Sequence, residues 1–311
     1  MNRFLALLGL LLSIQAGAET ISFAAFGDTP YRHWERENLP DMLAEMDRDR
    51  LAFVVHVGDI KSSSSACTDA VFEDMHRLFE SSLHPLIYTP GDNEWTDCDR
   101  DGPHQPEERL ARLRQLFHGK EQALGKTPLP LERQSRQAAY TMYRENVRWQ
   151  QGPLLLLTLH VPGSRNNIMD VHRPSAEFLA RNAANLEWLA QGFHMAKAKA
   201  LPGIVIFMHA NPGLEQTGRG KLRSGYAELV QQLVRHTREF RGQVLLVHGD
   251  THWHRVDQPL TDPANDRRLS NFTRVEVHGS PFMGWIRITA DPAQARLFRF
   301  EPRSYNATTV E

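Results

Sequence analysis

Side chains that can bind metal ions or move protons gather at the ends of apolar segments in this sequence. Residues 248–254, HGDTHWH, hold three histidines and one aspartate directly after the apolar segment VLLV. Gly-Asp pairs follow three earlier apolar segments and place Asp28, Asp59 and Asp92 there. A further apolar segment ends at His209. Carboxylates and imidazoles suit transition-metal ions, so this distribution indicates a metal site.

One Gly-Asp pair after a strand is ordinary turn chemistry, because glycine allows positive φ and aspartate caps a following helix. Capping does not explain three Gly-Asp pairs together with two further strand ends that carry histidines. If the ends converge, the crowded carboxylates require a cation as counter-charge. Mixed Asp, Asn and His ligands favour Fe, Mn or Zn, and the ligand count favours two ions. Two ions about 3.5 to 4 Å apart generate hydroxide and clamp phosphoryl oxygens, which predicts phosphoester hydrolysis.

The elements that must position these side chains read as a layered α/β fold. Apolar segments of strand length alternate with segments of helical period, and several are apolar on nearly every residue, which predicts a sheet covered on both faces. Ligands of such sheets bind beyond the carboxyl ends of the strands. We expect strands at 21–26, 51–57, 84–89, 153–161, 203–209, 243–248 and 273–279.

Apolar residues at helical spacing predict three amphipathic helices. One carries Tyr226, Leu229, Val230 and Leu233, a second lies within 175–200, and the third carries Leu110, Leu113 and Phe117. Residues 284–302 alternate in polarity and predict a hairpin at the sheet edge.

The order and spacing of the polar residues resemble the calcineurin-like metallophosphoesterases, whose motifs read D-x-H, G-D, G-N-H-E/D, H and G-H-x-H. The resemblance covers residues 21–290 and implies a four-layer α/β/β/α sandwich of mixed sheets. It also implies that the aspartate of the second motif, Asp59, bridges two metal ions. The metal ligands that it implies are Asp28, Asp59, Asp92, His209, Asp250 and His252.

The sequence departs from that pattern at positions that matter for chemistry. Pro30 stands where the first motif has a metal-binding histidine. Tyr31 is next to it and either supplies a phenolate ligand, as a tyrosine does in purple acid phosphatases, or simply packs. Asn93 replaces a histidine that contacts phosphate, so it can hydrogen-bond phosphate through its amide but cannot protonate a leaving group as an imidazolium does.

The segment 248–254 fits the last motif in two registers. In the first, Gly249 and Asp250 begin the motif and His252 ends it; in the second, His252 and His254 are its two histidines. The first register keeps a glycine, which permits a tight backbone against metal ions, and we expect it. His248 then supports the site from below or replaces a ligand, whereas His56 is expected to be a core residue.

Further residues are candidates for catalysis and substrate binding. Asn93, Asp92 and His248 are the candidate catalytic residues, and Arg165, Asn166 and Asn93 the candidate substrate-binding residues. Arg165 either forks onto a phosphate or is an exposed loop residue. Residues 96–136 form either a lid or specificity insert, or a solvated helical flank.

Other enzyme classes fit poorly. The G-x-S-x-G motif of serine hydrolases is absent, and Gly218 is followed by Arg219 rather than the lysine of a P-loop. The expected function is therefore metal-dependent hydrolysis of a small phosphate monoester or diester. The alternative is a metal- or ligand-binding module on the same scaffold that has lost turnover through Pro30 and Asn93.

Composition sets the remaining expectations. The 311 residues carry a formal charge of −1, which disfavours nucleic acid as a partner. Residues 1–18 have the basic start, apolar stretch and small-residue end of a signal peptide, and residues 19–311 are expected to form one domain. No later segment approaches the ~20 apolar residues of a membrane span. We therefore expect an exported protein, periplasmic or secreted, in which Cys67 and Cys98 either pair or stay as thiols.

Overall fold

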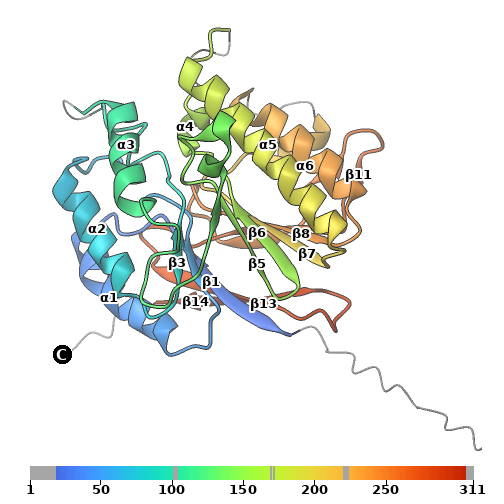
Figure 1. Cartoon of the computed structure of the whole chain (residues 1–311), viewed down its shortest axis with the longest axis horizontal. Coiled ribbons are helices and arrows are strands. Elements are labelled where there is room, and N and C mark those ends of the chain that lie inside the picture. The colour runs from blue at the N-terminus through green and yellow to red at the C-terminus, as the bar shows by residue number, and fades with distance from the viewer. Residues whose placement is uncertain (1–18, 101–103, 169, 171, 220–223, 306–311) are drawn as a thin grey trace, which may run out of the picture.

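Two mixed β-sheets pack face to face between two layers of helices (Figure 1). This computed structural model describes residues 19–100, 104–168, 170, 172–219 and 224–305. The four-layer α/β/β/α architecture is thus confirmed. The predicted signal peptide, residues 1–18, lies outside the described residues.

The first sheet has the strand order β14-β13-β1-β2-β3. The central strands β1, β2 and β3 are parallel, while β13 runs antiparallel to β1 and pairs with β14 in the predicted edge hairpin. The strands are β1 (Ile21–Phe26), β2 (Val54–His56), β3 (Leu86–Tyr88), β13 (Gly284–Ala290) and β14 (Phe298–Ser304).

The second sheet has the order β4-β5-β6-β7-β8-β12-β9. Strands β6, β7, β8 and β12 are parallel, and β5 and β9 run antiparallel to their neighbours. A small separate ribbon pairs β10 with β11. The strands are β4 (Glu132–Arg133), β5 (Val147–Gln151), β6 (Leu154–Thr158), β7 (Gly203–Phe207), β8 (Gln243–His248), β9 (Arg255–Asp257), β10 (Thr261–Asp262), β11 (Arg267–Arg268) and β12 (Phe272–Glu276).

Helices cover the outer face of each sheet. Helices α1 (His33–Asp47), α2 (Asp69–Ser81) and α3 (Pro106–Phe117) pack with the first sheet, and α5 (Ala176–Ala198) and α6 (Ala227–Glu239) with the second. Short helical turns are α4 (Gly163–Asn166), η1 (Gln134–Arg136), η2 (Ala138–Tyr140), η3 (Leu214–Arg219) and η4 (Ser224–Tyr226). No helix among the described residues is long and apolar enough to cross a membrane.

The apolar strands feed two cores at once, because successive side chains of a strand point to opposite faces. In β1, Phe23 and Ala25 enter the core between the sheets, whereas Ala24 and Phe26 enter the core under α1 and α2. In β6, Leu154 and Leu156 face the other sheet, and the alternate leucines face α5 and α6. Burial on both faces explains why these strands read as continuous apolar segments.

The predicted strands all form, and two of them, 21–26 and 243–248, have the predicted bounds. The other strands are shorter than their apolar segments by a few residues. Helices α1 and α2 and strand β5 were not predicted. The three predicted helices are α3, α5 and α6; α3, which lies in the segment 96–136, buries Leu113 and Phe117 in the helix-covered core, while the role of that segment as a specificity insert stays a prediction.

Cys67 and Cys98 form a disulfide with their Cα atoms 5.7 Å apart, so the pairing expectation is confirmed. The bridge joins the start of α2 to the turn after β3. The carbonyl oxygen of Asn93 lies 3.7 Å from Sγ of Cys67 and 3.8 Å from Sγ of Cys98. The disulfide therefore fixes the backbone of the segment that carries Asp92 and Asn93.

Replacing both cysteines with serine should lower the free energy of unfolding by roughly 3.5 kcal/mol, because the bridge closes a loop with a sequence separation of 31 residues. Urea denaturation of the double variant and of the wild type measures the difference. Reducing agent should lower the stability of the wild type by a similar amount and leave the double variant unchanged. Equal stability of the two proteins would contradict the expectation.

Candidate metal centre

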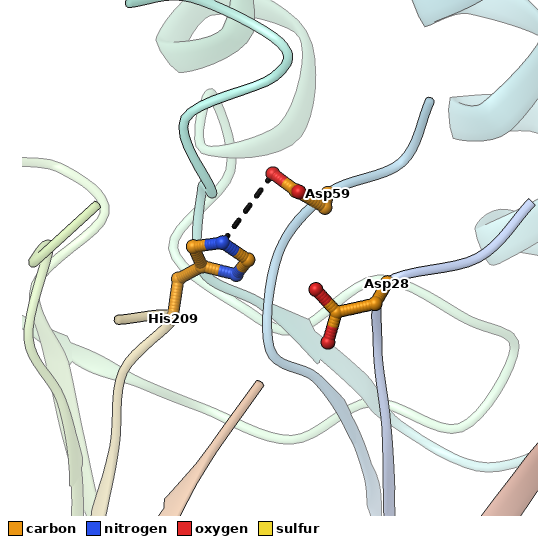
Figure 2. Close-up of side chains that lie close together, drawn as sticks. All are labelled: Asp28, Asp59 and His209. Atoms are coloured by element: carbon orange, nitrogen blue, oxygen red, sulfur yellow. Dashed lines mark ion pairs between the residues drawn. The ribbon is translucent and has the colours of Figure 1, made fainter. Parts of the chain in front are cut away.

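The centre lies where the carboxyl ends of the central strands of both sheets meet. Asp28 follows β1, Asp59 follows β2, and His209 follows β7, so three residues that are far apart in sequence converge (Figure 2). Figure 2 shows the three side chains pointing toward one another. Parallel strands place their carboxyl ends at one edge of a sheet, and the face-to-face packing joins the two edges.

Two groups of side chains are close enough to hold a metal ion each. Ligand atoms of Asp28, Asp59 and His209 all lie within 4.8 Å of one another, and so do those of Asp92, His209 and Asp250. Nε2 of His209 is 2.9 Å from Oδ1 of Asp92 and 3.5 Å from Oδ1 of Asp59. Nε2 of His252 is 3.5 Å from Oδ1 of Asp28. The structure thus brings together all six residues that the sequence nominated as metal ligands.

Hydrogen bonds from Nδ1 leave Nε2 of both histidines available to a metal ion. Nδ1 of His209 is 2.9 Å from the carbonyl oxygen of Val57, and Nδ1 of His252 is 2.7 Å from that of Ser280. A carbonyl oxygen only accepts, so each Nδ1 carries the proton. A backbone carbonyl that fixes the tautomer in this way is typical of metal-binding histidines.

Four residues of the centre have left-handed backbones. Asp28, Asp59, Asp250 and His252 have φ values of 51°, 62°, 80° and 59°. Such conformations are unfavourable by roughly 1 to 2 kcal/mol for each residue with a side chain. Strain of this kind concentrates at functional sites, where the surrounding structure maintains it.

The segment 248–254 adopts the first of the two registers. Asp250 and His252 face Asp28 and His209, whereas Nδ1 of His254 bonds to the carbonyl oxygen of Glu276 and its ring stacks on His278 with centroids 4.1 Å apart. A Cβ atom on Gly249 would lie 2.1 Å from Oδ2 of Asp28. Only glycine fits there, which is the reason for the Gly-Asp pair.

Tyr31 and Asn93 both contact the carboxylate of Asp59. The hydroxyl of Tyr31 donates to Oδ2 of Asp59, and Nδ2 of Asn93 lies 2.5 Å from the same oxygen and 2.9 Å from the tyrosine hydroxyl. The tyrosine ring also packs edge-on against His252, with centroids 5.1 Å apart. Tyr31 therefore lies at the centre beside Pro30, where a ligand histidine was missing.

Two buried glutamates that the sequence did not single out hold the ligand loops in place. Glu94 accepts hydrogen bonds from the backbone nitrogens of Asp59 and Gly91, at 3.1 and 2.7 Å. Glu35 accepts from the backbone nitrogen of Tyr31 at 2.5 Å and from the hydroxyl of Ser280 at 2.6 Å. Glu94 stands at the acidic position of the G-N-H-E/D motif, so the resemblance pointed to it although it was not nominated as a site residue. Glu35 meets Ser280 across 245 residues, so only the fold reveals it.

Crowded charges shift the protonation of the centre. Burial raises the pKa of Asp59 well above its usual range, and nearby carboxylates add to this although His209 opposes it. Burial also raises the pKa of Asp250, to about 6. Burial alone would lower the pKa of His209, but Asp59, Asp92 and Asp28 raise it well above its usual value. The protein by itself therefore retains protons that bound cations would displace.

A left-handed turn closes one side of the centre. Residues 164–167, in and after α4, all have positive φ. The hydroxyl of Ser164 donates to Oδ2 of Asp92 at 2.7 Å. A Cβ atom on Gly163 would lie 2.4 Å from Oδ1 of Asp92 and 2.6 Å from Oδ1 of Asp250, so the turn approaches both ligands closely.

Asn166, a predicted substrate-binding residue, points into the protein rather than toward the centre. Asn166 is buried, and its side chain donates to the carbonyl oxygen of Gly225 at 2.7 Å and accepts from Arg181 at 2.5 Å. These bonds anchor the turn from the inside, so the amide is not presented to a substrate. Arg165, by contrast, is exposed next to Ser164, and its role in phosphate binding stays a prediction.

Two other histidines are core residues. His248 is fully buried, its Nδ1 bonds to the carbonyl oxygen of Gly249 at 2.8 Å, and burial lowers its pKa to about 3. Complete burial keeps its ring from touching a substrate, so any effect on catalysis would be indirect. Burial likewise lowers the pKa of His56 to about 4, and His56 bonds to the backbone of Thr29 and Gly58, as expected of a core histidine.

Comparison with solved structures places this architecture among metallophosphoesterase folds. PhoD superposes with a TM-score of 0.55 at 12% identity, and the match covers 95% of this chain and 73% of the PhoD chain. A phosphatase from Mycoplasma pneumoniae gives a TM-score of 0.48 at 11% identity, with 93% and 94% of the two chains covered. Phosphopantetheinyl hydrolase from Mycobacterium tuberculosis gives 0.43 at 18% identity, with 85% and 91% covered.

The likeness to PhoD spans nearly the whole chain, and the chain has the metallophosphoesterase fold. No protein-family model matches the sequence. No curated protein matches it either.

Without metal, Asp250→Asn should stabilise the protein at neutral pH. The folded state raises the pKa of Asp250 to about 6, so the stability contributed by its protonated form is present below about pH 4 and lost as pH rises through 6. The variant should exceed the wild type by about 2 kcal/mol at pH 7.5, a figure discounted because Asp250 is partly exposed. Denaturation of chelator-treated protein at several pH values measures this difference.

Asp170→Asn, at an exposed carboxylate outside the centre, provides a control and should not reproduce the gain in stability at pH 7.5. A difference between Asp250→Asn and wild type that does not grow between pH 4 and pH 7.5 would contradict the expectation.

Proposed function

We propose that this protein is a metal-dependent phosphoester hydrolase with a dinuclear centre. The observation that carries the proposal is the pair of ligand groups that share His209, within 4.8 Å for each group. One imidazole nitrogen binds one ion, so we assign His209, Asp92 and Asp250 to one ion, and Asp28 and His252 to the other. Asp59 belongs to the first group, its Oδ1 lies 3.5 Å from Nε2 of the shared His209, and it is the carboxylate proposed to bridge the two ions.

The residues present fit transition-metal ions. Nε2 of His209 and Oδ1 of Asp92 are buried and form an ion pair at 2.9 Å, and neither atom has a further hydrogen-bond partner. A metal ion between them would displace the shared proton and bind both atoms. The mixture of nitrogen and oxygen donors suits Fe, Mn or Zn.

When bound, such ions lower the pKa of water to supply a hydroxide nucleophile and clamp the oxygens around phosphorus. The chain's own part is to orient the ligands. The backbone nitrogens of Asp92 and Asn93 donate to Oδ1 of Asp59 at 3.1 and 3.0 Å and fix this carboxylate. The amide of Asn93 cannot give up a proton to a leaving group, so esters with weakly basic leaving groups should react fastest. Arg165, exposed beside the centre, is the residue proposed to bind the phosphate.

The alternative function is a metal- or ligand-binding module without turnover. Pro30 in place of a ligand histidine favours it, because one ion loses a donor. Tyr31 can compensate for the missing donor, since its hydroxyl already contacts Asp59 and could complete the coordination of that ion.

The disulfide supports a further proposal, that the protein acts outside the cytosol in an oxidising compartment.

The purified protein should contain about two transition-metal ions per chain. It should hydrolyse p-nitrophenyl phosphate or its diester faster than the phenyl analogues and lose activity on chelation. Elemental analysis and a chromogenic assay measure both. Metal retained without turnover on a broad panel of monoesters and diesters would favour the binding module instead.

Asp59→Asn should remove both metal binding and hydrolysis, because it deletes a charge from the carboxylate that is proposed to bridge the two ions. We expect activity to fall by about a hundredfold or more, within the range seen for loss of strong electrostatic stabilisation. Asp97→Asn, at a buried carboxylate outside both ligand groups, is the matched control. Full metal content in Asp59→Asn would refute the bridging role.

A further inference from the structure

Large aromatic side chains are exposed on the segments that carry or fix the metal ligands. Among the described residues, Trp253 is 73% exposed, Phe282 70% and Trp34 37%. Trp253 directly follows His252, and Trp34 directly precedes Glu35. Phe282 follows Ser280, whose carbonyl oxygen accepts from His252. Their position on the segments that hold the metal ligands, rather than their exposure alone, makes these side chains candidates for contact with a substrate.

The segments that carry Trp253 and Phe282 are joined at His252. Besides the bond from His252 to Ser280, the backbone nitrogen of Ser280 donates to the carbonyl oxygen of Asp28 at 2.9 Å. The nitrogen of Phe282 donates to the carbonyl oxygen of Gly279 at 3.0 Å, and that of Trp253 lies 3.3 Å from Oε1 of Glu276. These bonds fix the backbone under both aromatic residues, so the two rings extend from a rigid base next to a metal ligand.

The residues around Trp253 and Phe282 indicate what kind of molecule these two side chains bind. Residues 249–254 and 278–282 contain no lysine or arginine, and the adjacent Arg255 is paired with Glu215 and Glu276. An anionic membrane surface would need basic residues here. Exposed aromatic rings instead bind flat rings by stacking, whatever hydrogen bonds those rings offer. A phosphate held at the metal centre would bring its organic group to these loops.

We propose that the substrate is a small phosphoester whose organic group contains a planar aromatic ring, and that Trp253 and Phe282 bind this ring. The proposal rests on the proposed function and narrows its substrate class. A nucleotide and an arylalkyl phosphate share this chemistry. The ring supplies binding energy outside the reacting centre, and the metal ligands act on the phosphate.

The test compares esters that differ in the ring but share a leaving group. Adenosine 5′-monophosphate and ribose 5-phosphate both release a primary 5′ alcohol, and 2-(1-naphthyl)ethyl phosphate and 2-cyclohexylethyl phosphate form a second pair. The metal-loaded wild type should show a higher kcat/KM for the aromatic member. Preference in both pairs indicates a general aryl site, and preference in the first pair alone indicates a nucleotide site.

Variants identify the residues responsible. Trp253→Ala and Phe282→Ala should each reduce the preference about 2- to 10-fold and leave kcat/KM for the non-aromatic member unchanged. Trp253→Phe should retain most of it. Leu179→Ala, at a 53% exposed apolar residue on α5, is the matched control and should change nothing.

A second readout does not depend on turnover. Calorimetric titration with naphthylmethylphosphonate should show tighter binding than with methylphosphonate, and Trp253→Ala should reduce the difference by the same factor as it reduces the kinetic preference. If no ester is hydrolysed, the proposed function fails while this titration still decides the aromatic site. Hydrolysis with no preference for either aromatic ester overturns the aromatic site alone. Preferences unchanged in both alanine variants, with reduced binding to phosphatidylcholine vesicles, would overturn it in favour of membrane contact.

Discussion

Mutual repulsion among carboxylates is the constraint around which this molecule is organised. Asp28, Asp59, Asp92 and Asp250 meet around one imidazole, in a region mostly closed to water. Charges of one sign so placed are tolerable only with compensation. The backbone supplies part of it, since Asp59 accepts two main-chain N–H bonds, and Asp28 accepts from the nitrogen of Asp250. The rest of the negative charge is compensated by His209, by protons that the carboxyls retain, or by bound cations.

That constraint explains features which look unrelated in isolation. Left-handed backbones turn the ligands inward at the strand ends, and Gly249 makes room for the carboxylate of Asp28. Glu35 and Glu94, both fully buried, accept hydrogen bonds from the loops that bear the ligands. Each device carries a local free-energy cost, and the apolar cores between the sheets and under the helices outweigh these costs. A stable scaffold thereby maintains a centre that is unfavourable without its counter-ions.

The sequence predicted what depends on local pattern. Asp28, Asp59 and His209 could be nominated because each follows a strand buried on both faces, and such strands are recognisable as continuous apolar segments. The partnership of Glu35 with Ser280 could not be predicted, because no local rule connects residues 245 positions apart. The inward orientation of Asn166 could not be predicted for a related reason. An asparagine in a loop next to an arginine is typical of a substrate contact, but burial against Arg181 and Gly225 turned it inward.

The ligands come from two different sheets, and this has a mechanical consequence. Asp28, Asp59 and Asp92 follow strands of the five-stranded sheet, whereas His209, Asp250 and His252 follow strands of the seven-stranded one. Ions bound among these ligands would cross-link the two sheets at the interface between them. Any sliding of one sheet on the other would stretch the coordination bonds. The resistance of the sheet interface to shear should therefore increase when the centre binds ions and decrease when it loses them.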